Sequence, residues 1–369
     1  MSRFARGRRV FFLEEPVFED VEPQLRSSVC PKTGVNVVTP VLPRGLSQQE
    51  ITTYQKRFVG SLLEENNISN YIAWYYTPMA LEFSSGLRPD VTVYDCMDEL
   101  SAFAGAPAAM RNNEATLFQR ADLIFTGGAS LYESKRKQHP SVHLFPSSVE
   151  VGHFAQARSI KSQPEDQTSV PEPRLGYAGV IDERMDLDLI RGIASERPHW
   201  QIIMLGPVVK INPVALPRAI NIHYLGMKPY ADLPGYFAGW RIGMLPFALN
   251  DSTRFISPTK TPEYLAAGLQ VISTPIRDVI TPYGDLGLVK IASGTSEFIR
   301  AADCLLESPI SSEEQSRIDQ FLSQSSWDKT WSDMNQLIET KLSFKHLPVD
   351  NGLQVASTNN MAVKGASNV

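Results

Sequence analysis

The sequence has few cysteines and no pattern typical of a metal site. Its 369 residues include only Cys30, Cys96 and Cys304, an odd number of thiols at wide spacing. This usage excludes a disulfide-stapled domain and favours buried thiols in a reducing, cytoplasmic compartment. The six histidines show no ligand spacing, and no Ser-His-Asp or Cys-His arrangement stands out. We therefore expect neither a metal ion nor a hydrolase-type nucleophile.

Long apolar runs and an excess of positive charge are also missing. No run of eighteen apolar residues is present, so no transmembrane helix is predicted. The net charge of −5 argues against a nucleic-acid binder, because phosphate contacts require a basic surface. Four arginines lie within residues 1–9, without the apolar segment of a signal peptide. They could touch an anionic membrane surface, although a solvated helix end would contain the same residues.

The remaining composition is that of a soluble protein with two domains. Hydrophobic residues make up 43% and charged residues 20% of the chain, which is long enough for two cores. Strand-like and helix-like segments alternate through residues 1–156 and again through 174–344, which predicts two parallel α/β sheets. Residues 157–173 are polar and rich in proline, as in a linker. Residues 345–369 have the composition of a disordered tail.

The first half starts unusually for such a domain. Residues 2–9 are predicted as the end of a helix, and strands follow at 10–13 and 35–43. A doubly wound domain normally begins with a strand, a phosphate-facing loop and a helix. That strand and most of that helix are absent, so we expect a chain that is shortened at its start. Farther along, Ser47 and Glu50 predict a capping box at a helix start.

Residues 255–276, FISPTKTPEYLAAGLQVISTPI, form the most informative stretch. Its hydroxyl residues and prolines favour a short helix that begins near Thr259, with Pro262 in the first turn, where no N–H donor is required. Gly268 fits a left-handed residue at the end of this helix. A buried strand over 271–274 then follows.

Lys260 and Glu263 share one face of this predicted helix, because they are three residues apart. Free amides at the helix start and the lysine beside them favour an anion such as phosphate. The glutamate could accept two hydrogen bonds from a vicinal diol, such as that of ribose. Together these groups indicate a site for a nucleoside diphosphate. The alternative is a surface Lys–Glu pair on a core helix, but the strands on either side favour a site.

This stretch resembles the donor-binding segment of the retaining, "group 1" GT-B glycosyltransferases. Those proteins often carry S-P-x-K-x-x-E-Y-x-A-x-G followed by a V-x-S-T strand, a pattern matched here over residues 257–274. The resemblance implies that Glu263 holds the nucleotide ribose, and that Lys260 and the helix start at Ser257 and Thr259 hold the diphosphate. Many relatives have a further acidic residue eight positions before the glutamate, where this chain has Phe255.

A second candidate region follows the first strand of the second half. Gly179 stands at the tip of that strand, where a glycine lets a ligand approach the backbone. Arg184 could complete a diphosphate clamp. A strand–helix turn with a solvated arginine predicts the same residues equally well. The GT-B resemblance favours Gly179 as the point of close donor approach.

In the first half, acidic residues cluster at a strand tip, in YDCMDE at 94–99. Asp95 could act as a general base or orient an acceptor hydroxyl, whereas Asp98 is better placed to cap the next helix. The spacing is not the D-x-D of metal-dependent transferases, so a required divalent metal is not expected. His153 lies near the expected hinge, where a structural role is the simpler interpretation.

Two more groups have open roles. The polar loop Asn250, Ser252 and Thr253 could reach sugar hydroxyls, but an ordinary loop would contain the same residues. Tyr224 and Tyr230 could flank a base, although core packing explains either tyrosine taken alone.

The resemblance implies a retaining glycosyltransferase with two Rossmann-like domains facing a cleft, the GT-B fold. The donor would be a nucleoside diphosphate sugar, with uridine the commonest base among relatives, and no further cofactor is expected. Lys260, Arg184 and the helix start would stabilise the leaving diphosphate. The family favours a carbohydrate or lipid-linked acceptor in cell-surface polysaccharide synthesis, in the cytoplasm or at the inner membrane face. The alternatives are a nucleotide-sugar epimerase of the same fold and a non-catalytic nucleotide-binding module.

Overall fold

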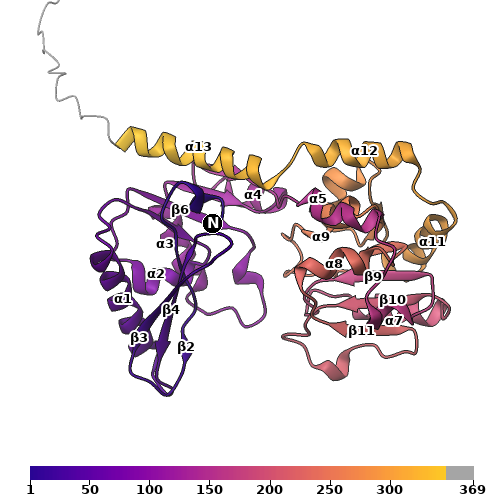
Figure 1. Ribbon diagram of the computed structural model, residues 1–369, viewed down its shortest axis with the longest axis horizontal. Helices are drawn as coiled ribbons and strands as arrows, with labels where there is room; N and C mark the ends of the chain where they lie inside the picture. Colours follow the sequence, from indigo (N-terminus) through magenta and orange to yellow (C-terminus); the bar gives the residue numbers. More distant parts are fainter. Residues whose placement is uncertain (346–369) are drawn as a thin grey trace, which may run out of the picture.

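The computed structural model describes residues 1–345, which form two α/β domains with separate hydrophobic cores (Figure 1). The predicted fold class and the two strand–helix alternations are confirmed. The tail predicted to be disordered lies outside the described residues, apart from its first residue. No helix within residues 1–345 has both the length and the apolar content needed to cross a lipid bilayer.

The second domain is built on a six-stranded parallel sheet in the order β11-β10-β9-β12-β13-β14. Its strands are β9 (Arg174–Ala178), β10 (Gln201–Leu205), β11 (Ile222–Gly226), β12 (Ile242–Leu245), β13 (Gln270–Ser273) and β14 (Lys290–Ile291). The helical elements are α7 (Leu187–Glu196), η5 (Pro213–Ala215), η6 (Tyr230–Asp232), α8 (Leu233–Phe237), α9 (Lys260–Ala266), α10 (Arg277–Val279), η7 (Ile280–Gly284), α11 (Gly294–Glu307) and α12 (Ser312–Ser323).

Within this domain the strands take the order 3-2-1-4-5-6, so the sheet reverses its direction of winding between β9 and β12. Ligands of such sheets bind outside the carboxyl ends of the strands at this switch point. The sheet topology therefore points to the segments that follow β9 and β12, independently of any sequence motif.

Close packing fixes α9 beneath the end of β9. Tyr264 is fully buried on α9, and its hydroxyl accepts a hydrogen bond from the Ala178 N–H group at 2.7 Å. Gly243 on β12 leaves room for the tyrosine ring, since a Cβ there would lie 2.6 Å from a ring carbon. Gly268 has φ +81°, as predicted for the residue that ends this helix. The face of α9 that carries Lys260 and Glu263 is thereby held in one orientation.

The first domain has two four-stranded sheets. One is parallel and consists of β5 (Ile72–Tyr75), β6 (Val91–Cys96), β7 (Leu123–Thr126) and β8 (Val142–Leu144). The other places β4 (Asn36–Leu42) between β3 (Gln24–Val29), which is antiparallel to it, and the short parallel strands β1 (Phe11–Leu13) and β2 (Val17–Phe18). The helical elements are η1 (Phe4–Arg6), α1 (Gln48–Glu65), η2 (Pro78–Ala80), α2 (Leu81–Ser84), η3 (Leu100–Ala102), α3 (Met110–Arg120) and α4 (Ala129–Lys135).

Local predictions in this domain have mixed outcomes. The capping box of Ser47 and Glu50 is confirmed at the start of α1. The helix end predicted for residues 2–9 is a single 3₁₀ turn, η1. Strands β2 and β3 were not predicted, because β3 is mostly exposed and has no alternating apolar pattern.

The linker, predicted over 157–173, is packed onto the second domain. It follows α5 (Val151–Phe154) and contains the second half of η4 (Ala155–Arg158) and all of α6 (Glu165–Thr168). The fully buried amide of Gln167 accepts a hydrogen bond from Trp240 Nε1 at 2.8 Å and donates one to the Tyr236 carbonyl at 3.0 Å. Polar composition here reflects specific hydrogen bonds rather than a flexible tether.

The final helix, α13 (Trp327–Lys345), returns to the first domain (Figure 1). Ile338 on α13 is fully buried in a cluster with Phe4, Val93 and Phe125. The prediction that the second domain extends to residue 344 is therefore wrong for this helix. Its partner surface lies more than 200 residues earlier in the chain, where no local sequence pattern could reveal it.

Three of the four N-terminal arginines bind α13, whereas Arg9 donates a hydrogen bond to the Asn66 carbonyl oxygen at 3.2 Å. Arg3 and Arg6 each lie 2.9 Å from the Asp328 carboxylate, and Arg8 pairs with Glu339. These contacts complete the attachment of α13 to the first domain, although exposed ion pairs contribute little stability individually.

We expect Ile338→Ala to destabilise the first domain by about 2–5 kcal/mol, because it leaves a cavity in a packed cluster. Phe344→Ala on the same helix is the matched control, since Phe344 is largely exposed. Urea unfolding of both variants tests the placement of α13. Equal effects of the two substitutions would contradict it.

Candidate functional site

The site lies outside the carboxyl ends of β9 and β12. The tips of β9 and β10 pack against each other through glycine, since a Cβ on Gly206 would lie 1.8 Å from the Gly179 carbonyl oxygen. Beyond Gly179 the chain turns through residues 181–185, which pair with residues 207–209 and 246–248. Gly179 and Arg184 thus occupy the rim of the switch point, where the topology favours a ligand.

Lys260 and Glu263 form an ion pair on α9. Glu263 is 9% exposed, Lys260 is half-buried, and residues 261–266 of the helix are buried, so these residues are not an ordinary surface pair. Burial is the largest influence on Glu263 and raises the pKa of its carboxyl group, although the positive charges of Lys260 and His153 lower it. Burial at this position removes water that would stabilise the charged carboxylate. Ionisable groups whose pKa is shifted in this way are common at functional sites.

His153 from α5 reaches the same region. Its imidazole stacks on the Tyr230 ring at 4.4 Å between centroids, and Nε2 lies 3.0 Å from the Tyr230 carbonyl oxygen. Its charge also acts on Glu263. Tyr230 is about half exposed, whereas the Tyr224 hydroxyl donates a hydrogen bond to the Pro217 carbonyl at 3.0 Å. The stacked pair thus forms an accessible aromatic surface beside α9, and Tyr224 has a structural contact.

Arg184 is oriented by its neighbour Asp182. Arg184 Nε lies 2.9 Å from Asp182 Oδ1, and Nη2 lies 2.7 Å from Oδ2. Burial disfavours the charged guanidinium, but these hydrogen bonds outweigh it, so the pKa of Arg184 is raised. Its Nη1 group donates to no acceptor in residues 1–345, so one face of the fork is available to an anion.

A loop of the first domain, residues 97–106, crosses toward Arg184. The Phe103 ring lies 5.6 Å from both the Arg184 guanidinium and the Lys210 ammonium, and the Ala104 N–H group points at Glu183 Oε1 at 3.4 Å. Glu99, near the start of this loop, forms an ion pair with Lys135 of the same domain. The loop therefore forms the first-domain wall of the site.

Lys135 anchors that loop from inside the domain. Its side chain is almost fully buried, and its ammonium lies 2.8 Å from both Glu99 and Glu114. Tyr94 also donates a hydrogen bond to Glu114, at 2.9 Å. The sequence analysis did not identify this network, because its members are far apart in the chain and follow no motif.

Asp98, rather than Asp95, faces the second domain. Burial raises the pKa of Asp98, and the Arg184 charge lowers it, so Asp98 lies within the electrostatic range of Arg184, although no hydrogen bond or ion pair joins the two side chains within residues 1–345. The expectation that Asp98 caps the next helix is wrong, because Glu99 is the N-terminal cap residue of η3. Asp98 is therefore the acidic residue that the first domain presents to the site.

Asp95 is turned into the first domain. It is buried, accepts a hydrogen bond from Trp74 Nε1 at 3.1 Å, and interacts with the amino group of Met1. The structure does not bring it together with Lys260 or Arg184 through any contact within residues 1–345. The two residues differ because Asp95 is part of β6, where its side chain is buried, whereas Asp98 follows the end of that strand.

The remaining predicted residues lie around the cleft entrance. Asn250 Oδ1 accepts hydrogen bonds from the backbone of Ser252 and Thr253, which fits an ordinary self-capped loop. Phe255 packs against the core of the first domain, so an apolar contact occupies the position where many relatives have an acidic residue. Thr259 is the cap residue of α9 but makes no side-chain capping bond. Ser257 lies beside Gly128 of the first domain.

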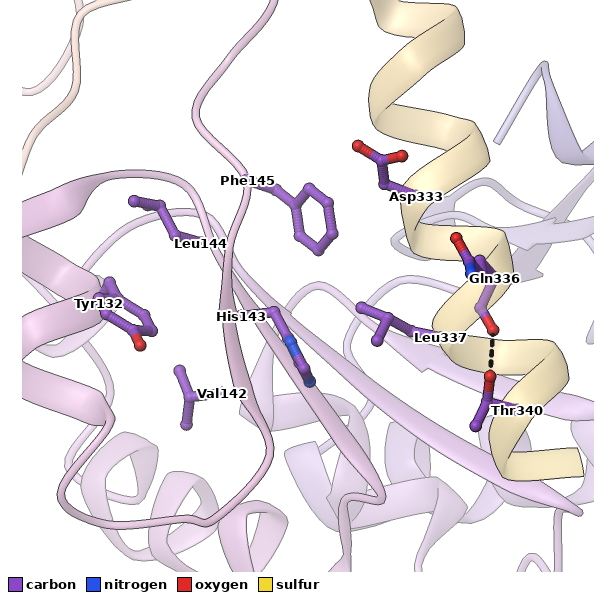
Figure 2. Close-up of a pocket in the computed structure, with 9 residues that line it drawn as sticks. All are labelled: Tyr132, Val142, His143, Leu144, Phe145, Asp333, Gln336, Leu337 and Thr340. Atoms are coloured by element: carbon purple, nitrogen blue, oxygen red, sulfur yellow. Dashed lines mark hydrogen bonds between the residues drawn. The ribbon is translucent and has the colours of Figure 1, made fainter. Parts of the chain in front are cut away.

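No group of three or more metal-ligating side chains occurs in residues 1–345. Cys96 is buried as expected for a structural thiol, whereas Cys304 is exposed, contrary to that expectation. A groove of about 670 Å³ lies elsewhere, between β8 and α13, where Phe145, His143 and Leu337 face one another (Figure 2). None of the predicted site residues lines it.

Comparison with known proteins supports the same fold. No family model matches the sequence. TuaH of Bacillus subtilis (strain 168), provisionally named as a teichuronic acid biosynthesis glycosyltransferase, is 28% identical over 225 residues. The match covers 54% of each chain, so this chain spans about half the length of that relative.

Several solved structures are similar over most of the chain. Sucrose-phosphate synthase from Thermosynechococcus elongatus superposes with a TM-score of 0.69 at 12% identity, covering 93% of this chain and 91% of that one. A UDP-forming trehalose-phosphate synthase from Burkholderia xenovorans gives 0.63 at 11%, covering 89% and 92%. Anabaena HepE, solved with UDP and glucose, gives 0.61 at 15%, covering 85% and 87%. The chain has the GT-B fold, and the resemblance to GT-B glycosyltransferases is confirmed.

The buried carboxyl of Asp95 makes stability depend on pH. Burial raises its pKa to about 7, against an unfolded value of about 4. Between these values the folded state retains a proton that the unfolded chain releases, so the free energy of unfolding falls as pH rises, by at most about 1.4 kcal/mol per pH unit. We expect Asp95→Asn to remove this component in urea unfolding at pH 4–8. Parallel curves for the two proteins would contradict it.

Proposed function

We propose that this chain is a glycosyltransferase that moves a sugar from a nucleoside diphosphate donor, with uridine as the base, to a hydroxyl acceptor. The observation that carries the proposal is the buried Lys260–Glu263 pair at the switch point of a 3-2-1-4-5-6 sheet. This is where doubly wound domains bind nucleotides. The pair combines a phosphate-binding cation with an acceptor for ribose hydroxyls.

The two cations retain free donors for the diphosphate. Lys260 donates one of its three N–H groups to Glu263. The Nη1 group of Arg184 donates no hydrogen bond within residues 1–345. Both groups would neutralise the charge that develops on the diphosphate as the glycosidic bond breaks. Because cationic side chains can supply this stabilisation, the proposed reaction needs no further cofactor.

Glu263 would orient the nucleoside. Its Oε2 atom binds Lys260, which leaves Oε1 to accept a hydrogen bond from a ribose hydroxyl. The Tyr230–His153 stack lies beside it and offers a flat aromatic surface for the base. Gly179 would allow the donor to approach the backbone at the tip of β9.

The first domain would supply the acceptor side. Asp98 lies within the electrostatic range of Arg184 and replaces Asp95 as the acidic group that could orient an acceptor hydroxyl. A retained anomeric configuration, which the sequence resemblance implies, would fit an acceptor that enters from the side of the leaving diphosphate.

The relatives favour a role in cell-surface polysaccharide synthesis. TuaH is named for teichuronic acid biosynthesis, and HepE and the trehalose-phosphate synthase are described with UDP or as UDP-forming. We propose a carbohydrate or lipid-linked acceptor, and a lipid-linked acceptor would place the chain in the cytoplasm at the inner membrane face.

The donor site is tested by comparing UDP with 2′-deoxy-UDP in calorimetric titrations. We expect the wild type to bind UDP about tenfold more tightly or better, because a hydrogen bond to a charged group contributes about 1.5–3 kcal/mol. In Glu263→Ala the two ligands should bind equally. Glu313→Ala is the matched control, an exposed glutamate of the same domain.

A preference for UDP that survives in Glu263→Ala would contradict the assigned ribose contact. Incubation with UDP-sugars then separates the activities. A transferase releases UDP in the presence of acceptor, an epimerase returns a different UDP-sugar, and a non-catalytic module changes nothing.

A further inference from the structure

Asp278 connects the two domains through a buried hydrogen bond, and the function proposed above gives this residue no role. It lies on α10 of the second domain, and its Oδ1 atom accepts a hydrogen bond from the Ser130 N–H group of the first domain at 3.0 Å. Asp278 is 4% exposed, so this carboxylate is buried between the domains. Burial raises its pKa, although its contacts with Ser130 and Ala129 of the first domain lower it.

The bonded amide is one that α4 cannot satisfy by itself. Ser130 is the second residue of α4, and the first four N–H groups of a helix have no partner within it. A carboxylate at this end also interacts favourably with the helix dipole. Asp278 therefore acts as a cap for α4, supplied by the other domain.

Gly128 makes this close approach possible. A Cβ at this position would lie 2.2 Å from Asp278 Oδ2 and 2.8 Å from Ser257 Cβ. The backbone of Gly128 is extended, with φ −158° and ψ 160°, so other residues could adopt it. Glycine is required here by the space that Asp278 and Ser257 occupy, and Oδ2 is buried beside Gly128 without a hydrogen-bond partner within residues 1–345.

The contact extends to the acidic loop on the other side. A Cβ on Gly127 would lie 2.6 Å from the Met97 carbonyl oxygen, so the β7–α4 junction supports the start of loop 97–106, next to Asp98. On its opposite side the junction meets Ser257, which begins the donor-binding motif. The junction thus fixes the distance between loop 97–106 of the first domain and the proposed donor site of the second domain.

We infer that Asp278 is a positioning residue for the transfer reaction. It holds the β7–α4 junction, and through it Asp98, against the donor-binding motif in the closed arrangement of the domains. This inference rests on the proposed function for its catalytic consequence, whereas the interdomain bond itself can be tested without activity.

The direct test is amide hydrogen exchange at Ser130, followed by mass spectrometry with residue-level fragmentation. In Asp278→Ala we expect this amide to exchange about tenfold faster or more, because it loses a charged partner. We also expect a larger radius of gyration in X-ray scattering as the domains separate. Gly128→Ala should produce the same two changes, since its methyl group displaces Asp278.

Two variants serve as controls. Arg277→Gln removes an exposed ion pair with Glu133 of α4, which also joins the domains, and should leave both measurements unchanged because exposed ion pairs contribute little. Gly60→Ala adds a methyl group where no atom lies within 4 Å, so it should also leave the exchange rate of Ser130 and the radius of gyration unchanged. In the double variant the effects of Gly128→Ala and Asp278→Ala should not add, because both break one contact.

Steady-state kinetics distinguish a loss of domain positioning from a loss of donor binding. Asp278→Ala should lower kcat while the KM for the donor and the dissociation constant for UDP stay the same. Unchanged exchange at Ser130 would overturn the interdomain bond, and faster exchange without a change in radius would overturn the positioning role. If the wild type fails to bind UDP, the proposed function fails, but the exchange and scattering results still decide the contact.

Discussion

The site depends on the bond between Tyr264 on α9 and the Ala178 amide at the end of β9. A buried phenol must find a hydrogen-bond partner, and this one finds the last residue of the central strand. Since Glu263 directly precedes Tyr264, the direction of the tyrosine fixes that of the glutamate and of Lys260 one turn before it. The residues that could hold a nucleotide are thus oriented by the core rather than by a surface loop.

Charge is arranged differently on the two sides of the cleft. The second domain presents Lys260, Arg184 and Lys210, whereas the first presents Asp98 on a loop anchored by the buried Lys135–Glu99 pair. Buried charges need partners, and each of the anchoring groups has one. On the second domain two of these cations are paired with carboxylates, Lys260 with Glu263 and Arg184 with Asp182, so their orientation is fixed before any ligand binds.

The helices outside the sheets connect the two halves. Helix α13 returns to the first domain and buries Ile338 there, while the linker is held on the second domain by the buried amide of Gln167. Asp278 adds a polar contact near the cleft itself. The relative position of the domains is therefore set by packing of α13 and by contacts near the site, among which Asp278 contributes the buried hydrogen bond.

The sequence by itself determined the fold class and the helix that carries Lys260 and Glu263, the residues on which the proposed nucleotide site rests. These features depend on local signals: alternating strands and helices, prolines at a helix start, and a glycine at its end. Only the tertiary structure decided that Asp98 rather than Asp95 faces the cleft, that α13 belongs to the first domain, and that Asp278 caps α4. Each of these depends on residues distant in the chain meeting in space, or on which face of a strand points inward, and no local pattern specifies such a meeting.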